Sequence, residues 1–273
     1  MKPRSVLLKD ANHQNSDFRL DGKGAVVTGG ARGIGRAIAL TFAAHGAFVH
    51  ILDIDPEQAT ATVAEIKQAG GQAAMTGCDV CDSAAVRGAF QKASEHGHID
   101  VLVNSAGIAH IGTLESTTET DFDSVYRVNV KGVFICMQAA VPHMKSNGGG
   151  VILNIASIAA SAGLANRFAY STTKGAVLSM TYSVAKDYLQ HNIRCNSISP
   201  ARVHTPFVDG FLKKHYPGKE KENFELLARS QPVGRMARPE EVASLALFLC
   251  TDAGACVTGA DYPLDGGFFN LRG

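Results

Sequence analysis

The stretch Gly24-Ala25-Val26-Val27-Thr28-Gly29-Gly30-Ala31-Arg32-Gly33-Ile34-Gly35 decides the fold of this chain. Its first five residues are an apolar, β-prone run, and a glycine-rich turn follows them. A helical pattern then runs over residues 34–45, so the stretch predicts a strand, a tight turn and a helix. The phosphates of a dinucleotide can bind at such a turn, because glycines let the backbone come close and the start of the helix offers free N–H groups.

The glycines of this turn are spaced as Gly-x-x-x-Gly-x-Gly, at Gly29, Gly33 and Gly35. A glycine-rich turn alone is weak support for a nucleotide site, since many turns use glycine only for its conformation. Here the turn follows the first strand of an alternating pattern, which strengthens the interpretation. We therefore predict that Gly29, Arg32, Gly33, Ile34 and Gly35 contact a dinucleotide cofactor.

Beyond this stretch, apolar β-prone runs alternate with helical patterns, which predicts a parallel sheet covered by helices on both faces. Further strands are expected at residues 47–53, 72–77, 99–104, 151–156, 193–199 and 258–264, with long helices at 121–145 and 169–190. The expected fold class is α/β, a single Rossmann-like doubly wound domain over residues 20–273. Residues 1–19 are expected to form an N-terminal extension, and the polar segment 205–231 a helical pair that serves as a substrate lid.

The composition excludes several classes of function. The chain has 273 residues, of which 45% are hydrophobic and 19% charged, and its formal net charge is +1. This near-neutral balance gives no reason to expect nucleic acid or a membrane surface as a partner. No apolar run reaches the roughly 20 residues of a membrane span, and the first residues lack the apolar core of a secretion signal, so we expect a cytoplasmic protein.

The six cysteines are expected to be free thiols of a reducing compartment. Cys78 and Cys81 have the spacing of half a zinc site, but no second close pair with histidine completes it. We therefore expect no metal site.

Asp53 ends the second predicted strand, where an acidic side chain can accept hydrogen bonds from the adenosine ribose hydroxyls. A carboxylate there repels a 2′-phosphate, which predicts NAD (NAD+/NADH) rather than NADP. Arg32 opposes this prediction, because a guanidinium beside the glycine turn could pair with that phosphate. We give more weight to Asp53, since Arg32 can turn into solvent. The structural alternative is that Asp53 only stabilises the turn at the end of the strand.

The run Tyr170-Ser-Thr-Thr-Lys174 places a phenol and an ammonium group four residues apart, on one face of a predicted helix. A phenol keeps its proton to about pH 10, and a nearby cation lowers that pKa. Such a tyrosine can take a proton from an alcohol or give one to a ketone. Taken alone, the run is more typical of a surface helix, and the rest of the chain is what favours catalysis.

The sequence resembles the short-chain dehydrogenase/reductase family over residues 20–269, and in length it is similar to the compact branch of that family. The motifs that carry the resemblance are, in order, the turn at 28–35, Asp79-Val80, Asn104-Ser105-Ala106-Gly107, Asn129, Ser157, Tyr170 with Lys174, Pro200 with Thr205, and Asp265-Gly266-Gly267.

The resemblance implies four catalytic residues. Tyr170 would be the general acid and base, and Lys174 would bind the nicotinamide ribose and lower the pKa of Tyr170. Ser157 would hydrogen-bond the reacting oxygen. Asn129 would open its long helix and hold a water molecule linked to Lys174.

The resemblance also implies further cofactor contacts. Asp79 and Val80 would lie against the adenine, and Asn104, Ala106 and Gly107 against the ribose and pyrophosphate. The remaining predicted contacts are Pro200, Val203, Thr205, Tyr170 and Lys174. The family's usual second asparagine and its usual glycine after the proline are Ser105 and Ala201 here, and neither change touches the catalytic residues.

Substrate contacts are predicted for Ser157, Tyr170, Arg167 and His110. Arg167 could clamp a carboxylate with two hydrogen bonds, and the pair Asn166-Arg167 is similar to family members that oxidise small hydroxy acids or deoxy sugar acids. The alternative is that Arg167 pairs with an acidic residue across a subunit interface. His110 could bind a polar substrate, although a lone loop histidine more often has no such role.

We therefore predict an NAD-dependent oxidoreductase that moves hydride between nicotinamide and a secondary alcohol or ketone, of a sugar, sugar acid or small hydroxy acid. The alternatives are a 3-oxoacyl-thioester reductase and a non-catalytic NAD(H)-binding regulatory protein. By resemblance we also expect a homotetramer, built on apolar faces of the helices at 121–145 and 169–190. The residues assigned to those faces are Val130, Val133, Phe134, Met137, Val177, Met180 and Val184.

Overall fold

The computed structural model describes residues 16–271, so residues 1–15 of the expected N-terminal extension lie outside the described part. Seven strands form one sheet in the order β3-β2-β1-β4-β5-β6-β7, and every neighbouring pair is parallel. The strands are β1 (Gly24–Thr28), β2 (Phe48–Asp53), β3 (Gln72–Gly77), β4 (Val101–Asn104), β5 (Gly150–Ile155), β6 (Ile193–Pro200) and β7 (Asp261–Leu264). The predicted doubly wound α/β fold is confirmed.

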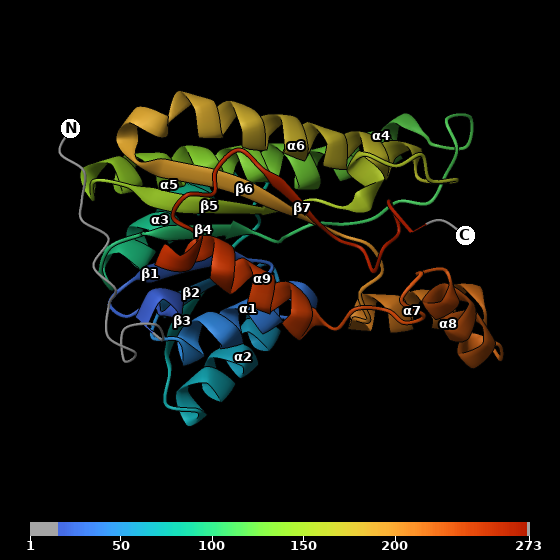
Figure 1. Cartoon of the computed structure of the whole chain (residues 1–273), viewed down its shortest axis with the longest axis horizontal. Helices are drawn as coiled ribbons and strands as arrows, with labels where there is room; N and C mark the ends of the chain where they lie inside the picture. The colour runs from blue at the N-terminus through green and yellow to red at the C-terminus, as the bar shows by residue number, and fades with distance from the viewer. Residues whose placement is uncertain (1–15, 272–273) are drawn as a thin grey trace.

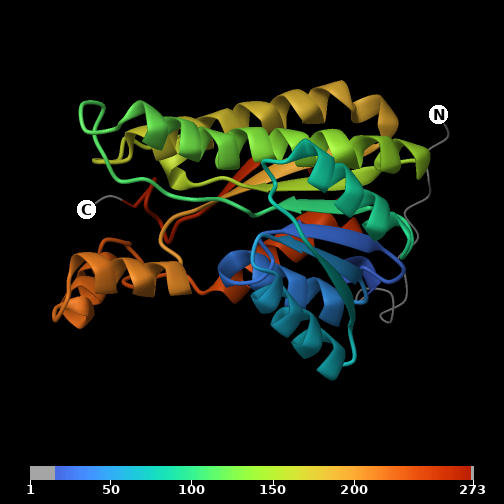
Figure 2. The same cartoon turned by 180° about the vertical axis from the view of Figure 1, so that it is seen from behind.

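Helices cover both faces of the sheet (Figure 1). One layer holds α1 (Gly33–Ala44), α2 (Pro56–Gln68) and α9 (Pro239–Cys250), and the other holds α3 (Ser83–Ser94), α4 (Glu119–Tyr126), α5 (Val133–Ser146) and α6 (Phe168–Asp187). The helices α7 (Pro206–His215) and α8 (Glu220–Arg229) stand beyond one end of the sheet, as the reverse view also shows (Figure 2). The strand order reverses between β1 and β4, and ligands of such folds bind where the strands around this point end.

Local sequence signals account for several helix starts. The side chain of Asp55 caps α2 by accepting from the Gln58 N–H, and Pro56 occupies the first turn, where its fixed φ fits. Asp82 caps α3 in the same way by accepting from Ala84 and Ala85. These caps fix where each helix leaves the sheet and therefore where the connecting loops lie.

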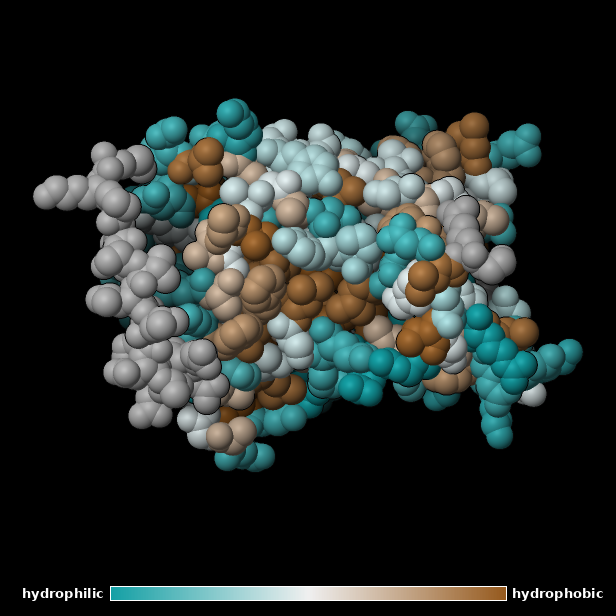
Figure 3. Space-filling view, viewed as in Figure 1, coloured by the Kyte–Doolittle hydropathy of each residue, from teal (hydrophilic) through white to brown (hydrophobic). Residues whose placement is uncertain are grey.

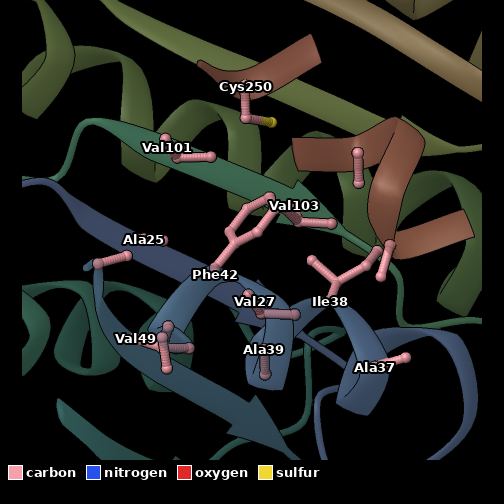
Figure 4. Close-up of a cluster of buried hydrophobic side chains, with 14 of the residues drawn as sticks. Ala25, Val27, Ala37, Ile38, Ala39, Phe42, Val49, Val101, Val103 and Cys250 are labelled. Carbon is pink, nitrogen blue, oxygen red and sulfur yellow. The ribbon is translucent and has the colours of Figure 1, made fainter. Parts of the chain in front are cut away.

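Two apolar clusters fill the layers on either side of the sheet. In the first, Ile38 and Phe42 of α1 lie against Val27 of β1 and Val103 of β4, with Cys250 of α9 above them (Figure 4). The buried faces of α1 and α9 therefore hold both helices on the sheet and present the glycine-rich turn at the end of β1.

The predicted helix at 121–145 is interrupted. Between α4 and α5 the backbone forms a π-helical segment, η3 (Arg127–Gly132), which contains Asn129. The predicted helix at 169–190 ends earlier, at Asp187, and a short 3-10 turn, η5 (Leu189–His191), follows it.

The apolar faces assigned to a subunit contact need correction. Val130, Val133, Met137 and Val177 are buried within the chain itself, and the last three belong to the apolar cluster on this side of the sheet. Phe134 is different, since 48% of it is exposed. The spacing of the apolar residues did not by itself show which of them face the sheet and which face solvent.

None of the helices in residues 16–271 is long and apolar enough to cross a membrane. The six cysteines are unpaired. Over the same residues, no group of three or more potential ligands is arranged to hold a metal ion.

His50 makes the fold sensitive to acid. It lies on β2 with 3% exposure, its Nε2 is 2.9 Å from Thr76 Oγ1, and its Nδ1 has no partner among the described atoms. Burial lowers the pKa of this imidazole to about 4, helped by the charges of His96 and Lys92. The unfolded chain binds the same proton near pH 6.5, so the folded state loses about 3 kcal/mol of stability as the pH falls from 6.5 to 4.

We expect His50→Leu to reduce the dependence of stability on pH. At pH 7 the variant should lose about 1 kcal/mol, because Thr76 loses a partner. Its free energy of unfolding should then fall less steeply than that of the wild type between pH 6.5 and 4, measured by urea unfolding. His98→Gln, at an exposed position, is the control and should follow the wild type. Equal slopes for wild type and His50→Leu would contradict the assignment.

Candidate active site

The predicted site residues come together at the carboxyl ends of the central strands. β1 ends at Thr28 and leads into the glycine-rich turn, β4 ends at Asn104, and β5 ends two residues before Ser157. Because these strands are parallel neighbours, their carboxyl ends meet at one edge of the sheet. The helix α6 runs back over this edge and carries Tyr170 and Lys174.

Tyr170 is half-buried beside Ser157, whose own side chain is buried. Burial raises the pKa of the Tyr170 phenol, while a hydrogen bond with the Ser157 hydroxyl and the positive charge of Arg167 act in the opposite direction. The Ser157 hydroxyl oxygen also accepts from the Ala159 N–H at 3.1 Å, which holds the side chain at the end of β5. The phenol and the hydroxyl therefore lie side by side at the end of β5.

Lys174 is buried, with 7% exposure, and its ammonium donates to the Ile155 carbonyl oxygen at 2.7 Å. Burial lowers its pKa to about 8. Its Nζ lies 5.7 Å from the centre of the Tyr170 ring. The sequence predicted that Lys174 lowers the pKa of Tyr170. In the structure, the groups that act to lower this pKa are Ser157 and Arg167.

Asn129 lies in the π-helical segment and is buried. Its amide accepts from the Ile108 N–H and donates to the Ile108 carbonyl oxygen, both at 2.9 Å, and it also donates to Thr173 Oγ1 at 3.1 Å. A side chain on Gly107 would come within 3.2 Å of Asn129 Oδ1 and 3.7 Å of Lys174 Nζ, so these residues are neighbours. The wide helical turn thus joins the loop after β4 to α6. The water-mediated link to Lys174 stays a prediction.

The glycine-rich turn has the shape that a pyrophosphate requires. Gly29 has a φ of +66°, and a Cβ there would lie 2.8 Å from the backbone of Ala106. A Cβ on Gly35 would overlap the carbonyl oxygen of Gly29. Gly33, with φ +58°, faces the methyl group of Thr205. No side chain of the described chain caps α1, so its first N–H groups remain available, and the turn fits a dinucleotide.

Two carboxylates lie beside this turn. Asp53 accepts from the Ala31 N–H at 2.9 Å and from the Asp55 N–H at 3.0 Å, so its charge is held at the end of β2 next to the glycine turn. These hydrogen bonds also stabilise the turn at the end of β2, which is the other role that the sequence analysis considered for Asp53. Arg32 forms an ion pair with Asp55.

The remaining predicted cofactor residues lie along the same edge. Asp79 accepts from the Cys81 N–H at 2.9 Å, and Val80 packs against Gly132 of η3. Pro200 ends β6, and Val203 is buried and bridges to Ala237. Each of these residues is placed along the sheet edge by its strand or by the loop after it.

Asn154, which forms a hydrogen bond with Asn104, was missed by the sequence analysis. The amide of Asn104 donates at 2.8 Å to Asn154 of β5, which is fully buried and itself donates to Thr181 of α6 at 2.9 Å. The side chain of Asn154 therefore links β4, β5 and α6. The available signal was a polar residue within a strand predicted to be buried on both faces.

On the predicted substrate side, Arg167 occupies the N-cap position of α6 and donates from Nη1 to the His110 carbonyl oxygen at 3.4 Å. The segments carrying them are joined, since Gly112 bridges to Arg167. The His110 ring turns elsewhere: its Nε2 is 3.7 Å from Asp121 Oδ2. The structure therefore places Arg167 three residues before Tyr170 at the start of α6, while the His110 ring lies beside Asp121; substrate contacts of both residues stay predictions.

Known proteins are similar to this chain over most of its length. A family profile described as "Enoyl-(Acyl carrier protein) reductase" matches residues 29–269. D-threitol dehydrogenase of Mycolicibacterium smegmatis is 40% identical over 253 residues, which cover 92% of this chain and 95% of that protein. Dehydrogenase/reductase SDR family member 6 of Rattus norvegicus is 39% identical over 251 residues, covering 92% and 98%.

Solved structures of known proteins are also similar to this chain. The 7 alpha-hydroxysteroid dehydrogenase complexed with NADH and 7-oxo glycochenodeoxycholic acid superposes with a TM-score of 0.84 at 35% identity, covering 92% of this chain and 96% of that one. The chain is an oxidoreductase that acts on CH–OH groups, of a class that uses nicotinamide cofactors. Within this class it belongs to the short-chain dehydrogenase/reductase family, as the sequence motifs predicted.

Proposed function

We propose that this protein is an NAD-dependent dehydrogenase for a secondary alcohol of a small polar substrate, a sugar derivative or a hydroxy acid. The observation that carries the proposal is the proximity of Ser157, Tyr170 and Lys174 at the edge that holds the glycine-rich turn, with Ser157 and Lys174 buried and Tyr170 half-buried. The similarity to a D-threitol dehydrogenase supports a polyhydroxylated substrate.

In this proposal the nicotinamide, when bound, supplies the hydride chemistry. Ser157 hydrogen-bonds the reacting oxygen, and Tyr170 exchanges a proton with it. Since burial raises the pKa of Tyr170, the phenol is protonated at neutral pH in this state and can donate to a ketone; to accept the proton of an alcohol, it must first release its own. Lys174, whose pKa burial lowers to about 8, can take up that proton when neutral and return it when protonated. Asn129 holds the loop and α6 together around this path.

The preference for NAD follows from charge. Asp53 holds a negative charge beside the turn, where an adenosine ribose would bind, and it would repel a 2′-phosphate. Arg32 is engaged by Asp55, so it is not available to compensate.

The segment 205–231 has the character of a lid in this proposal. It contains α7 and α8, which stand beyond the carboxyl edge of the sheet (Figure 2). Phe207 and Leu226 expose 63% and 56% of their surface. Exposed apolar side chains on a short helical pair suit a cover that buries them when substrate binds.

We propose a homotetramer because two separate apolar areas face outward. One lies on the α4–α6 layer, where Tyr126, Phe134 and Tyr182 are 45–48% exposed. The other lies over α9 and the edge strand β7 (Figure 3), where Phe248 and Tyr262 are only partly buried. Two distinct two-fold contacts generate a closed assembly of four subunits.

Light scattering should give the mass of four chains. Phe134→Asp, which places a charge in one of the two areas, should reduce the mass to that of two chains. A monomeric wild type, or an unchanged mass for Phe134→Asp, would contradict this arrangement.

Tyr170→Phe tests the catalytic assignment. It should lower kcat by about 10²- to 10⁴-fold, because the proton-transfer group is removed while the ring remains. NADH binding, followed by the fluorescence of the bound cofactor, should change little. Full turnover by Tyr170→Phe would contradict the proposed mechanism. NADH binding without turnover of any alcohol or ketone in a broad panel would favour the regulatory alternative.

Asp53→Asn tests the cofactor assignment. The wild type should use NAD more efficiently than NADP by at least about tenfold. The variant keeps an oxygen for a backbone N–H but loses the charge, so the ratio of kcat/KM for NAD to that for NADP should fall. A wild type that prefers NADP would instead favour the 3-oxoacyl-thioester reductase.

A further inference from the structure

Two arginines start from the edge that holds Tyr170, although they are far apart in the sequence. Arg167 is the N-cap residue of α6, three residues before Tyr170. Arg202 follows Pro200, the last residue of β6, and β6 pairs with β5, the strand that leads to Ser157. Both side chains are half-buried.

Each guanidinium is anchored by a neutral group. Arg167 Nη1 donates to the His110 carbonyl oxygen at 3.4 Å. Arg202 Nε donates to Ser230 Oγ at 2.9 Å, and Ser230, at the C-cap of α8, donates in turn to the Leu227 carbonyl oxygen. A guanidinium has five N–H donors in a fixed fork, so both anchors leave most donors for a ligand.

Neither arginine forms an ion pair with a carboxylate within residues 16–271. Other arginines nearby in the sequence do: Arg229 pairs with Glu225, and Arg235 with Glu241 at 2.7 Å. Burying a cation without a counter-ion is unfavourable. The position of Arg167 adds charge of the same sign, since it lies at the N-terminus of α6, the positive end of the helix dipole, and the first turn of α6 has no acidic residue.

The fold places both arginines toward the phenol. Arg167 begins α6 three residues before Tyr170, and Arg202 lies two residues beyond the end of β6, the parallel neighbour of β5. In agreement with this placement, burial and the charge of Arg167 lower the pKa of Arg202, and the same charge acts to lower the pKa of Tyr170. A region of uncompensated positive charge therefore lies next to the candidate proton-transfer group.

We propose that Arg167 and Arg202 together bind a carboxylate of the substrate. The protein then prefers hydroxy acids or sugar acids over neutral polyols. A guanidinium matches a carboxylate with two parallel hydrogen bonds, and two such groups supply the missing negative charge with a fixed orientation. This inference rests on the proposed dehydrogenase function and narrows its substrate class. Because Ser230 ends α8, the same carboxylate would also link the α7–α8 segment to α6.

The test compares acids with their neutral counterparts. Matched pairs are 3-hydroxybutyrate with butane-1,3-diol, and D-threonate with D-threitol. We expect the wild type to prefer the acid of a pair. Arg167→Gln and Arg202→Gln should each lower kcat/KM for the acid by about 10- to 100-fold, the range for hydrogen bonds to a charged group, and change that for the neutral partner less than about threefold. The double variant should lose less than the product of the single losses, because both residues bind one group.

Arg229→Gln is the matched control, since Arg229 is adjacent to Ser230 but exposed and paired with Glu225. It should leave the acid preference unchanged. Calorimetric titration of malonate into the NADH complex provides a readout without turnover: binding to the wild type, and its loss in Arg202→Gln, is expected.

The outcomes separate the two proposals. If neutral substrates react as well as acids and the glutamine variants affect both equally, the carboxylate site is wrong while the dehydrogenase stands. If nothing in the panel reacts, the proposed function fails, and malonate then decides the site: binding that is lost in Arg202→Gln supports it, and no binding overturns it. If Arg167→Gln instead dissociates the assembly in light scattering, the guanidinium serves a subunit contact and the inference is overturned.

Discussion

The buried ammonium of Lys174 donates a hydrogen bond to the carbonyl oxygen of Ile155, and the arrangement of the candidate site depends on this contact. An ammonium that is removed from water needs such an acceptor, so the contact fixes α6 over the end of β5. Tyr170 lies one helical turn earlier on the same face of α6. Ser157 follows Ile155 by two residues. One bond between a helix and a strand therefore brings a phenol, a hydroxyl and an amine together.

Buried amides support this contact from two sides. Asn129 uses the wide turn of the π-helical segment to hold the loop after β4 and Thr173 of α6. Asn154 joins β4, β5 and α6 beneath the site. Buried polar groups stabilise a structure only when they are hydrogen-bonded, so these two residues specify one position of α6 relative to the sheet.

Charge divides the edge of the sheet into two parts. The end near β2 is acidic, with Asp53 beside the glycine-rich turn and Asp55 paired to Arg32. Toward β6, Arg167 and Arg202 form no ion pair with a carboxylate of the described residues, and their partners are the His110 carbonyl oxygen and Ser230. The proposed cofactor without a 2′-phosphate and the proposed substrate with a carboxylate both complement this distribution.

The sequence alone was enough for the order of strands and helices along the chain, the glycine-rich turn and the Tyr170–Lys174 pair. These features depend on residues close together in the chain: alternating apolar runs, a cluster of glycines, and the spacing of one helical turn. The resemblance to the family added Ser157 and Asn129 to the predicted catalytic residues.

Only the tertiary structure decided which side of a helix faces inward and which distant charges meet. Val130, Val133, Met137 and Val177 proved to be buried within the chain, because a helix between a sheet and a second helix needs more than one apolar side. The pairing of Arg32 with Asp55, the link from Asn104 to Asn154, and the approach of Arg167 to Arg202 join residues far apart in sequence. Such contacts are set by the packing of strands and loops in space, and no local pattern of residues contains that information.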